Sequence, residues 1–191
     1  MPSDKDSDKL LRKVESRRSV LKTHPFEVEE LCFSSGLHPY YRLNCPDWVN
    51  ILPLTDQGEA ILIRQFRAGS LSVVLETPGG VVDPDEKKDP TLTAKRELEE
   101  ETGYSSQKLL YMGSVNPNPA LQNNRVHFFV AFHCVLSPKR THLPDPDENI
   151  QVQLVKSDEL SNLVRTGQID HALSAHCILL AEKYVNSQKR I

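Results

Sequence analysis

The sequence has no closely spaced cysteine pair, no long apolar run and no apolar leader. Its four cysteines are spread over 191 residues without a CxxC pair, at Cys32, Cys45, Cys134 and Cys177. This argues against a zinc site or a redox motif, so we expect reduced, partly buried thiols. The apolar runs are far shorter than the ~20 residues that a membrane-spanning helix needs. Because the N-terminal MPSDKDSDKLLRK also lacks the apolar core of a signal peptide, we expect a cytoplasmic protein without membrane contact.

An excess of positive charge is also missing. The formal net charge is -3, which does not suit a surface that wraps nucleic acid, so we expect no nucleic-acid partner. Charged residues make up 26% of the chain and hydrophobic residues 38%, as in ordinary soluble globular proteins. A length of 191 residues suits one domain, or one domain with a small appendage.

Apolar periodicity and turn signals predict a series of strands with helices toward the C-terminus. The strands are expected at residues 26–33, 39–43, 48–54, 60–66, 73–77, 109–115, 126–136 and 150–155. Segment 126–136 is apolar on both faces, so it should be a central strand covered on both sides. A short helix should be capped by Ser157 and end at Gly167, and residues 171–184 should form the last helix. The sum is an α+β fold in which helices sandwich a mixed sheet.

One further helix carries an unusual number of acidic residues, in the segment TPGGVVDPDEKKDPTLTAKRELEEETGY at residues 77–104. Asp89 is a suitable N-cap, Pro90 fits the first helical position, and Gly103 suits a left-handed stop. These signals predict a helix over residues 90–102. At 100° per residue, Glu97 and Glu101 lie about 40° apart, and Glu100 lies on the same face.

Three glutamates on one face repel each other and, late in a helix, oppose its macrodipole. Lys95 and Arg96 can offset part of this charge, but a hard divalent cation would offset more, because carboxylate oxygens are its natural ligands. The pair Gly79-Gly80 precedes the helix, and glycine lets a backbone carbonyl approach an ion closely. A solvated charged helix is the alternative interpretation.

The same segment resembles the Nudix box of the Nudix hydrolases. Gly80 is followed by five residues, Glu86, and later by Arg-Glu-Leu-Glu-Glu-Glu-Thr-Gly-Tyr at residues 96–104. There are two departures from the family pattern. Nine residues rather than seven separate Glu86 from Arg96, and Tyr104 replaces the usual aliphatic residue. The longer spacing keeps the register of the helix but leaves the role of Glu86 open between bracing the loop and supporting a metal ligand.

The resemblance implies an α/β/α sandwich that uses Mg²⁺ or Mn²⁺ to hydrolyse a nucleoside diphosphate linked to another group. Glu97 and Glu101 would ligate the metal, with Glu100 assisting and the Gly79 carbonyl as a further ligand. Arg96 would orient Glu97 or Glu100 through a charge-assisted bond. The metal would neutralise the diphosphate and lower the pKa of a bound water, from which a carboxylate must take the proton.

Residues 64–67 (Arg-Gln-Phe-Arg) and 76–80 (Glu-Thr-Pro-Gly-Gly) look like the ADP-ribose and nucleotide-sugar pyrophosphatase branch of the family. The resemblance would place Arg67 on the substrate's phosphates and Glu76 against the substrate or a partner subunit. A surface salt bridge is the alternative for Arg67. Trp48, like Tyr40 or Tyr41, could stack on a base, although an aromatic residue in a strand is more often part of the core.

The resemblance implies that the general base lies in a loop before the last strand and helices, here the acidic loop 143–149. We expect Glu148 in this role, with Asp147 and Asp145 as substitutes and a solvated acidic turn as the alternative. Residues 1–20 should form a polar tail that is frayed or briefly helical. Residues 21–54 look like the N-terminal β region through which enzymes of this branch form homodimers, and residues 55–191 would form the Nudix domain.

The expected activity is cleavage of the pyrophosphate bond in ADP-ribose or a nucleotide sugar, which gives a nucleoside monophosphate and a sugar phosphate. Two alternatives stay open. One is a pyrophosphatase for nucleoside triphosphates or dinucleoside polyphosphates, and the other is a non-catalytic module that senses a nucleotide. The presence of Glu97, Glu100 and Glu101 together with Arg96 favours the enzyme.

Overall fold

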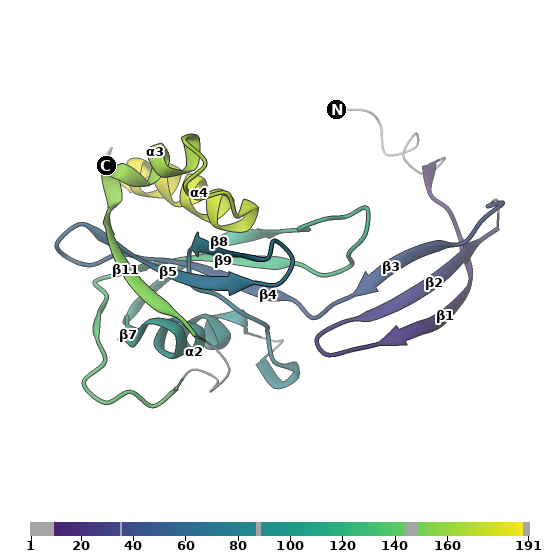
Figure 1. Ribbon diagram of the computed structural model, residues 1–191, viewed down its shortest axis with the longest axis horizontal. Helices are drawn as coiled ribbons and strands as arrows, with labels where there is room; N and C mark the ends of the chain where they lie inside the picture. Colours follow the sequence, from purple (N-terminus) through teal and green to yellow (C-terminus); the bar gives the residue numbers. More distant parts are fainter. Residues whose placement is uncertain (1–9, 35, 87–88, 144–148, 189–191) are drawn as a thin grey trace. The chain divides into compact units, whose positions relative to one another are not determined.

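A computed structural model describes residues 10–34, 36–86, 89–143 and 149–188 of the chain (Figure 1). The chain divides into two compact units. The first contains residues 1–46 and 116–124, and the second contains residues 47–115 and 125–191. The second unit contains the whole Nudix-box segment, residues 77–104, so it carries the candidate site.

The first unit is a three-stranded antiparallel sheet in the order β1–β2–β3. Its strands are β1 (Val14–Lys22), β2 (Glu27–Phe33) and β3 (Tyr40–Asn44). The expectation that residues 1–20 form a frayed or helical tail is wrong from Val14 onward. Cross-strand ion pairs such as Arg18–Glu30, at 3.0 Å, stabilise β1 against β2 although β1 is exposed along its whole length.

The second unit contains two three-stranded sheets, a two-stranded ribbon and the helices. The first sheet has the order β4–β9–β8, with β4 parallel to β9, and its strands are β4 (Trp48–Pro53), β8 (Lys108–Val115) and β9 (Val126–Phe132). The second is antiparallel in the order β11–β5–β6, and its strands are β5 (Glu59–Arg67), β6 (Ser72–Glu76) and β11 (Gln151–Lys156). The ribbon pairs β7 (Tyr104–Ser105) with β10 (Val135–Leu136). The helices are η2 (Pro84–Glu86), α2 (Pro90–Thr102), η3 (Ser157–Glu159), α3 (Leu160–Arg165) and α4 (Ala172–Gln188).

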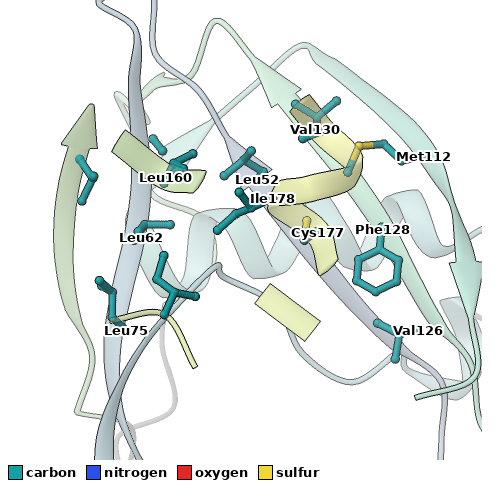
Figure 2. Close-up of a cluster of buried hydrophobic side chains, with 14 residues drawn as sticks. Leu52, Leu62, Leu75, Met112, Val126, Phe128, Val130, Leu160, Cys177 and Ile178 are labelled. Atoms are coloured by element: carbon teal, nitrogen blue, oxygen red, sulfur yellow. The ribbon is translucent and has the colours of Figure 1, made fainter. Parts of the chain in front are cut away.

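Strand β9 divides the hydrophobic core into two clusters. On one face Phe128 packs in a cluster with Cys177 and Ile178 of α4 (Figure 2). On the other face Phe129 packs in a cluster with Leu98 of α2. Helices therefore cover both faces, α4 on one and α2 on the other (Figure 1). The predicted α+β sandwich with a mixed sheet and a central apolar strand is confirmed.

The structure corrects two element boundaries. The central strand ends at Phe132 rather than Leu136, because His133 adopts a positive φ of 54° that interrupts the extended backbone. Ser157 is the first residue of η3, and neither η3 nor α3 has a side-chain hydrogen bond at its N-cap. Gly167, with a φ of 73°, follows α3 as predicted. Among the described residues, no helix is long and apolar enough to span a membrane, and the cytoplasmic location stays a prediction.

Candidate active site

Helix α2 begins and ends at the residues that its local sequence predicts. The side chain of Asp89 accepts a hydrogen bond from the Thr91 N–H at 3.0 Å, and Pro90 occupies the first helical position. Gly103 has a left-handed φ of 74°, and its N–H donates to the Glu99 carbonyl at 2.9 Å. These caps satisfy backbone groups that a helix end would otherwise leave without partners.

One side of α2 is anchored in the protein interior. Ala94 and Leu98 belong to the hydrophobic cluster against the sheet. Thr93 is fully buried and donates its hydroxyl to Glu86 Oε2 at 2.8 Å. Glu86 therefore braces the loop against the helix despite the longer spacing between Glu86 and Arg96. This anchoring offsets the repulsion among the glutamates.

Arg96 is surrounded by four carboxylates. Its Nη1 lies 2.9 Å from Glu97 Oε1 and 2.6 Å from Glu100 Oε2, and its Nη2 lies 3.4 Å from Asp83 and 3.5 Å from Glu86. Partial burial alone would lower the pKa of Arg96, but Glu97, Glu100 and Asp83 raise it above its usual value. Arg96 thus orients two glutamates of the Nudix box, and one positive charge faces a local surplus of negative charge.

The two glycines before the loop make room for two of the helix carboxylates. A Cβ on Gly80 would lie 2.3 Å from Glu97 Oε1, so the carboxylate occupies the space that any other residue would fill. A Cβ on Gly79 would lie 2.2 Å from a carbonyl oxygen of β4. The N–H of Gly79 donates to Glu101 Oε2 at 2.7 Å. Glu97 and Glu101 are therefore held against consecutive backbone units.

From the hydrogen bonds of its neighbours, we expect the carbonyl of Gly79 to face the helix rather than the sheet. The carbonyls of Pro78 and Gly80 each accept a hydrogen bond at 2.9 Å from an N–H of β4. Because successive carbonyls of an extended chain alternate in direction, the Gly79 carbonyl points to the opposite side. Its own N–H, which points the same way, donates to Glu101. The backbone thus presents an oxygen beside the carboxylates.

These residues have the chemistry of a divalent-cation site. The carboxylates of Glu97, Glu100 and Glu101 with the Gly79 carbonyl form an all-oxygen set, which Mg²⁺ and similar hard ions prefer. In the part of the chain that the structure describes, no three His, Cys, Asp or Glu side chains already converge as a metal group. Arg96 and the Gly79 N–H hold these carboxylates instead. The Gly80 cradle and the donor set fit a metal that would replace those contacts.

A second group of buried charge lies at the end of β6. Glu76 is fully buried, and its Oε1 lies 2.8 Å from Arg67 Nε of β5. Its Oε2 lies 2.9 Å from His171 Nδ1, just before α4. Arg67 keeps 44% of its side chain exposed. Sequence reasoning named Arg67 and Glu76 but missed His171, because no local pattern links residues this far apart.

The segment after β10 holds the C-terminal end of α2. Arg140 Nε donates to the Glu99 carbonyl at 3.2 Å, and its Nη2 donates to the Glu100 carbonyl. Thr141 donates its hydroxyl to Glu99 Oε2 at 2.6 Å, and this bond, aided by Ser137, lowers the pKa of Glu99. Sequence reasoning also missed this contact, which keeps Glu99 away from the glutamates of the opposite face.

Other predicted residues lie elsewhere or beyond the described part. Trp48 begins β4 and packs, partly buried, against the α4-side core cluster, which fits the core alternative. Tyr40 and Tyr41 are exposed in the first unit. Glu148, with its substitutes Asp147 and Asp145, lies outside the described residues.

A cavity of about 380 Å³ opens along the other side of α2. Leu92, Lys95 and Glu99 contribute to its lining, together with Gln107 and His142. Glu97 and Glu101 do not line it, but Arg96 and Glu86 do, so the cavity adjoins the charges around Arg96.

The fold and the glutamate-bearing helix together define a Nudix-type pyrophosphohydrolase site. The NUDIX domain model matches residues 46–176, which is more than half of the chain. The chain therefore belongs to the Nudix hydrolase family, whose members generally need divalent metal ions.

Individual relatives agree with this assignment. The chain is 33% identical over 133 residues to the ADP-ribose pyrophosphatase of Bacillus subtilis, an alignment that covers 70% of each chain. It is 31% identical over 182 residues to the ADP-sugar pyrophosphatase of Mus musculus, covering 87% of this chain and 78% of the relative. A crystal structure of an ADP compounds hydrolase superposes with a TM-score of 0.78 at 23% identity, covering 94% of this chain and 97% of the other, which supports the fold.

Proposed function

We propose that the protein hydrolyses the pyrophosphate bond of a nucleoside diphosphate linked to ribose or another sugar, and releases a nucleoside monophosphate and a sugar phosphate. The observation that carries this proposal is the packing of Glu97 and Glu101 against Gly80 and Gly79, with Arg96 orienting the acidic face. The names of the relatives support ADP-ribose or an ADP-sugar as the substrate class.

The metal-binding residues of this proposal are Glu97, Glu101 and the Gly79 carbonyl, with Glu100 assisting. Mg²⁺ is the proposed ion, with Mn²⁺ as the substitute, because the donor set consists of oxygens. When bound, such an ion neutralises the charge of the diphosphate and makes water more acidic. Arg96 holds Glu97 and Glu100 in place through hydrogen bonds of 2.9 and 2.6 Å.

The substrate's phosphates are assigned to Arg67. Its Nε is engaged by Glu76, so the planar guanidinium keeps the Nη groups for a bidentate contact with phosphate oxygens. Glu148 is the proposed general base, with Asp147 and Asp145 as substitutes, and all three stay predictions from the sequence.

We also propose that the first unit joins two copies of the chain. Strand β1 lies at an edge of its sheet and is exposed throughout, with Val14, Val20 and Leu21 among its exposed apolar side chains. Exposed edge strands and apolar patches are common association surfaces. The molar mass of the full chain in solution tests this: a value near twice 21.6 kDa is expected, and a monomer at high concentration would contradict it.

The substrate proposal is tested by product analysis over a panel of nucleotides. ADP-ribose, ADP-, UDP- and GDP-sugars, a nucleoside triphosphate and a dinucleoside polyphosphate are incubated with Mg²⁺ and then Mn²⁺. We expect equal amounts of nucleoside monophosphate and sugar phosphate from at least one diphosphate sugar, and much slower turnover by Glu101→Gln. Cleavage of triphosphates alone would contradict the diphosphate-sugar proposal and favour a nucleoside triphosphate pyrophosphatase. Tight nucleotide binding without cleavage would favour a sensing module.

A further inference from the structure

The buried carboxylate of Glu76 has one well-satisfied oxygen and one that needs a donor. Oε1 accepts from Arg67 Nε at 2.8 Å. Oε2 is shielded from solvent, and no donor of the described residues reaches it with hydrogen-bond geometry. His171 Nδ1 nevertheless lies only 2.9 Å away, within hydrogen-bonding distance, and it also lies 2.9 Å from Ser174 Oγ. A buried carboxylate oxygen without a donor is costly, which favours a proton on Nδ1.

Neighbouring hydrogen bonds are compatible with that proton. Thr77 donates its hydroxyl to Asn50 Oδ1 at 2.6 Å, and its N–H donates to Ser174 Oγ at 3.1 Å. Ser174 Oγ lies 3.1 Å from Thr77 Oγ1 and 2.9 Å from His171 Nδ1. The Ser174 hydroxyl can therefore donate to Thr77 Oγ1, whose own proton is already used. Nδ1 of His171 then need not accept a proton and can direct its own toward Glu76.

The position of His171 is set by a rigid element. It directly precedes α4, and its carbonyl accepts the Ala175 N–H at 2.9 Å. Ser174 in the first turn is fully buried, and Cys177 and Ile178 one turn later belong to the core cluster. His171 is thus fixed to the core through α4, whereas Arg67 is a long, partly exposed side chain on β5.

We propose that His171 is a positioning residue, which orients the buried Glu76 so that Glu76 aims the Arg67 guanidinium at the substrate's phosphates. This inference rests on the proposed role of Arg67. Because Glu76 engages Nε, its orientation decides where the two Nη groups lie. Loss of the His171 contact would let the Glu76 carboxylate rotate, and the substrate would then have to order Arg67 on binding.

Two substitutions at the same position separate positioning from general packing. The amide nitrogen of His171→Asn lies where Nδ1 lies and can still donate to Glu76, whereas His171→Leu removes the donor. We expect KM for the diphosphate sugar that the panel identifies to rise by about tenfold in His171→Leu, with kcat changed by less than about threefold. In His171→Asn we expect KM to stay within about threefold of the wild-type value. Equal KM values for the two variants would overturn the proposal.

A double-mutant cycle with Arg67→Ala decides whether His171 acts through Arg67. We expect His171→Leu to have no further effect on KM once Arg67 is absent. Additive effects would mean that His171 contacts the substrate itself and would overturn the positioning role. If Arg67→Ala alone leaves KM unchanged, the proposed phosphate contact of Arg67 fails first. If Arg67→Ala raises KM but His171→Leu does not, only the positioning role fails.

Discussion

Around Arg96 four carboxylates share one guanidinium, whereas around Glu76 one carboxylate is shared by a guanidinium and an imidazole. We call these the α2 carboxylate group (Asp83, Glu86, Glu97 and Glu100 with Arg96) and the Glu76 group (Glu76 with Arg67 and His171). The α2 carboxylate group has more negative than positive charge. In the Glu76 group the carboxylate is buried, whereas its partners Arg67 and His171 are partly exposed.

The opposite balance of the two groups matches the two charges of a metal-dependent diphosphate reaction. In our proposal, the α2 carboxylate group would lower its internal repulsion by binding a cation, and the Glu76 group would present donors to an anion. Both groups adjoin the same short stretch of chain, because β6 ends at Glu76 and the proposed metal-binding carbonyl is that of Gly79. This stretch links the proposed cation and anion sites within a few residues.

The largest effect should come from removing one charge from the α2 carboxylate group. In Glu97→Gln we expect kcat to fall by a hundredfold or more, on the order expected when a metal loses a charged ligand. We also expect Mg²⁺ to raise the unfolding temperature of the wild-type protein but not of this variant. Steady-state kinetics at saturating metal and thermal unfolding with and without Mg²⁺ measure these effects.

Glu99→Gln is the matched control, since it removes the same charge from the same helix. Glu99 is held by Thr141 and lies outside the α2 carboxylate group. We expect its kcat to stay within about threefold of wild type. Equal losses of kcat in the two variants would mean that net charge on α2, rather than the position of Glu97, controls activity.

Substitutions at the adjacent Gly79 and Gly80 should have different effects, because a Cβ at Gly79 would meet backbone and a Cβ at Gly80 would meet the Glu97 carboxylate. In Gly79→Ala the new Cβ would meet the backbone of β4 at 2.2 Å, so we expect a loss of about 1–3 kcal/mol in unfolding free energy. In Gly80→Ala it would meet the end of the flexible Glu97 side chain at 2.3 Å. That side chain can move, so we expect a smaller loss of stability but at least a tenfold fall in kcat, of order ~1.4 kcal/mol.

Chemical denaturation and kinetics on the same preparations measure this difference. Gly69→Ala is the control, because nothing lies within 4 Å of a Cβ at that position. If Gly80→Ala keeps full activity, the position of the Glu97 carboxylate beside Gly80 is not required for catalysis.

Local signals were sufficient to predict α2 and its acidic face. Asp89, Pro90 and Gly103 act within one turn of the helix ends, and the spacing of the glutamates sets their common face at 100° per residue. The central strand and its two covered faces were also predictable, because its run of apolar residues needs burial on both sides. In these cases the determining contacts lie near each other in the sequence or depend only on periodicity.

The parts that could not be predicted depend on distant partners. The sequence of β1 looks like a polar tail, and its antiparallel pairing with β2, with ion pairs such as Arg17–Glu29 at 3.7 Å, explains why it is extended. His171 reads as the start of a helix, and only the packing of α4 brings it to Glu76. Arg140 likewise gains its role from the return of the chain to the end of α2.

The smallest expected effect concerns Glu99, whose Oε2 accepts the Thr141 hydroxyl and lies 3.9 Å from His142 Nε2. Thr141→Val removes the donated hydroxyl, whereas Thr141→Ser keeps it, so we expect Thr141→Val to be less stable than Thr141→Ser by about 1 kcal/mol at neutral pH. The bond lowers the pKa of Glu99 below its ordinary value of 4.5, so its contribution is complete above that pH. As the pH falls through the lowered pKa of the folded state, Glu99 becomes protonated and the difference between the variants should shrink. Urea unfolding of both variants from neutral to acid pH measures this, and a difference that stays constant with pH would show that Thr141 contributes by packing alone.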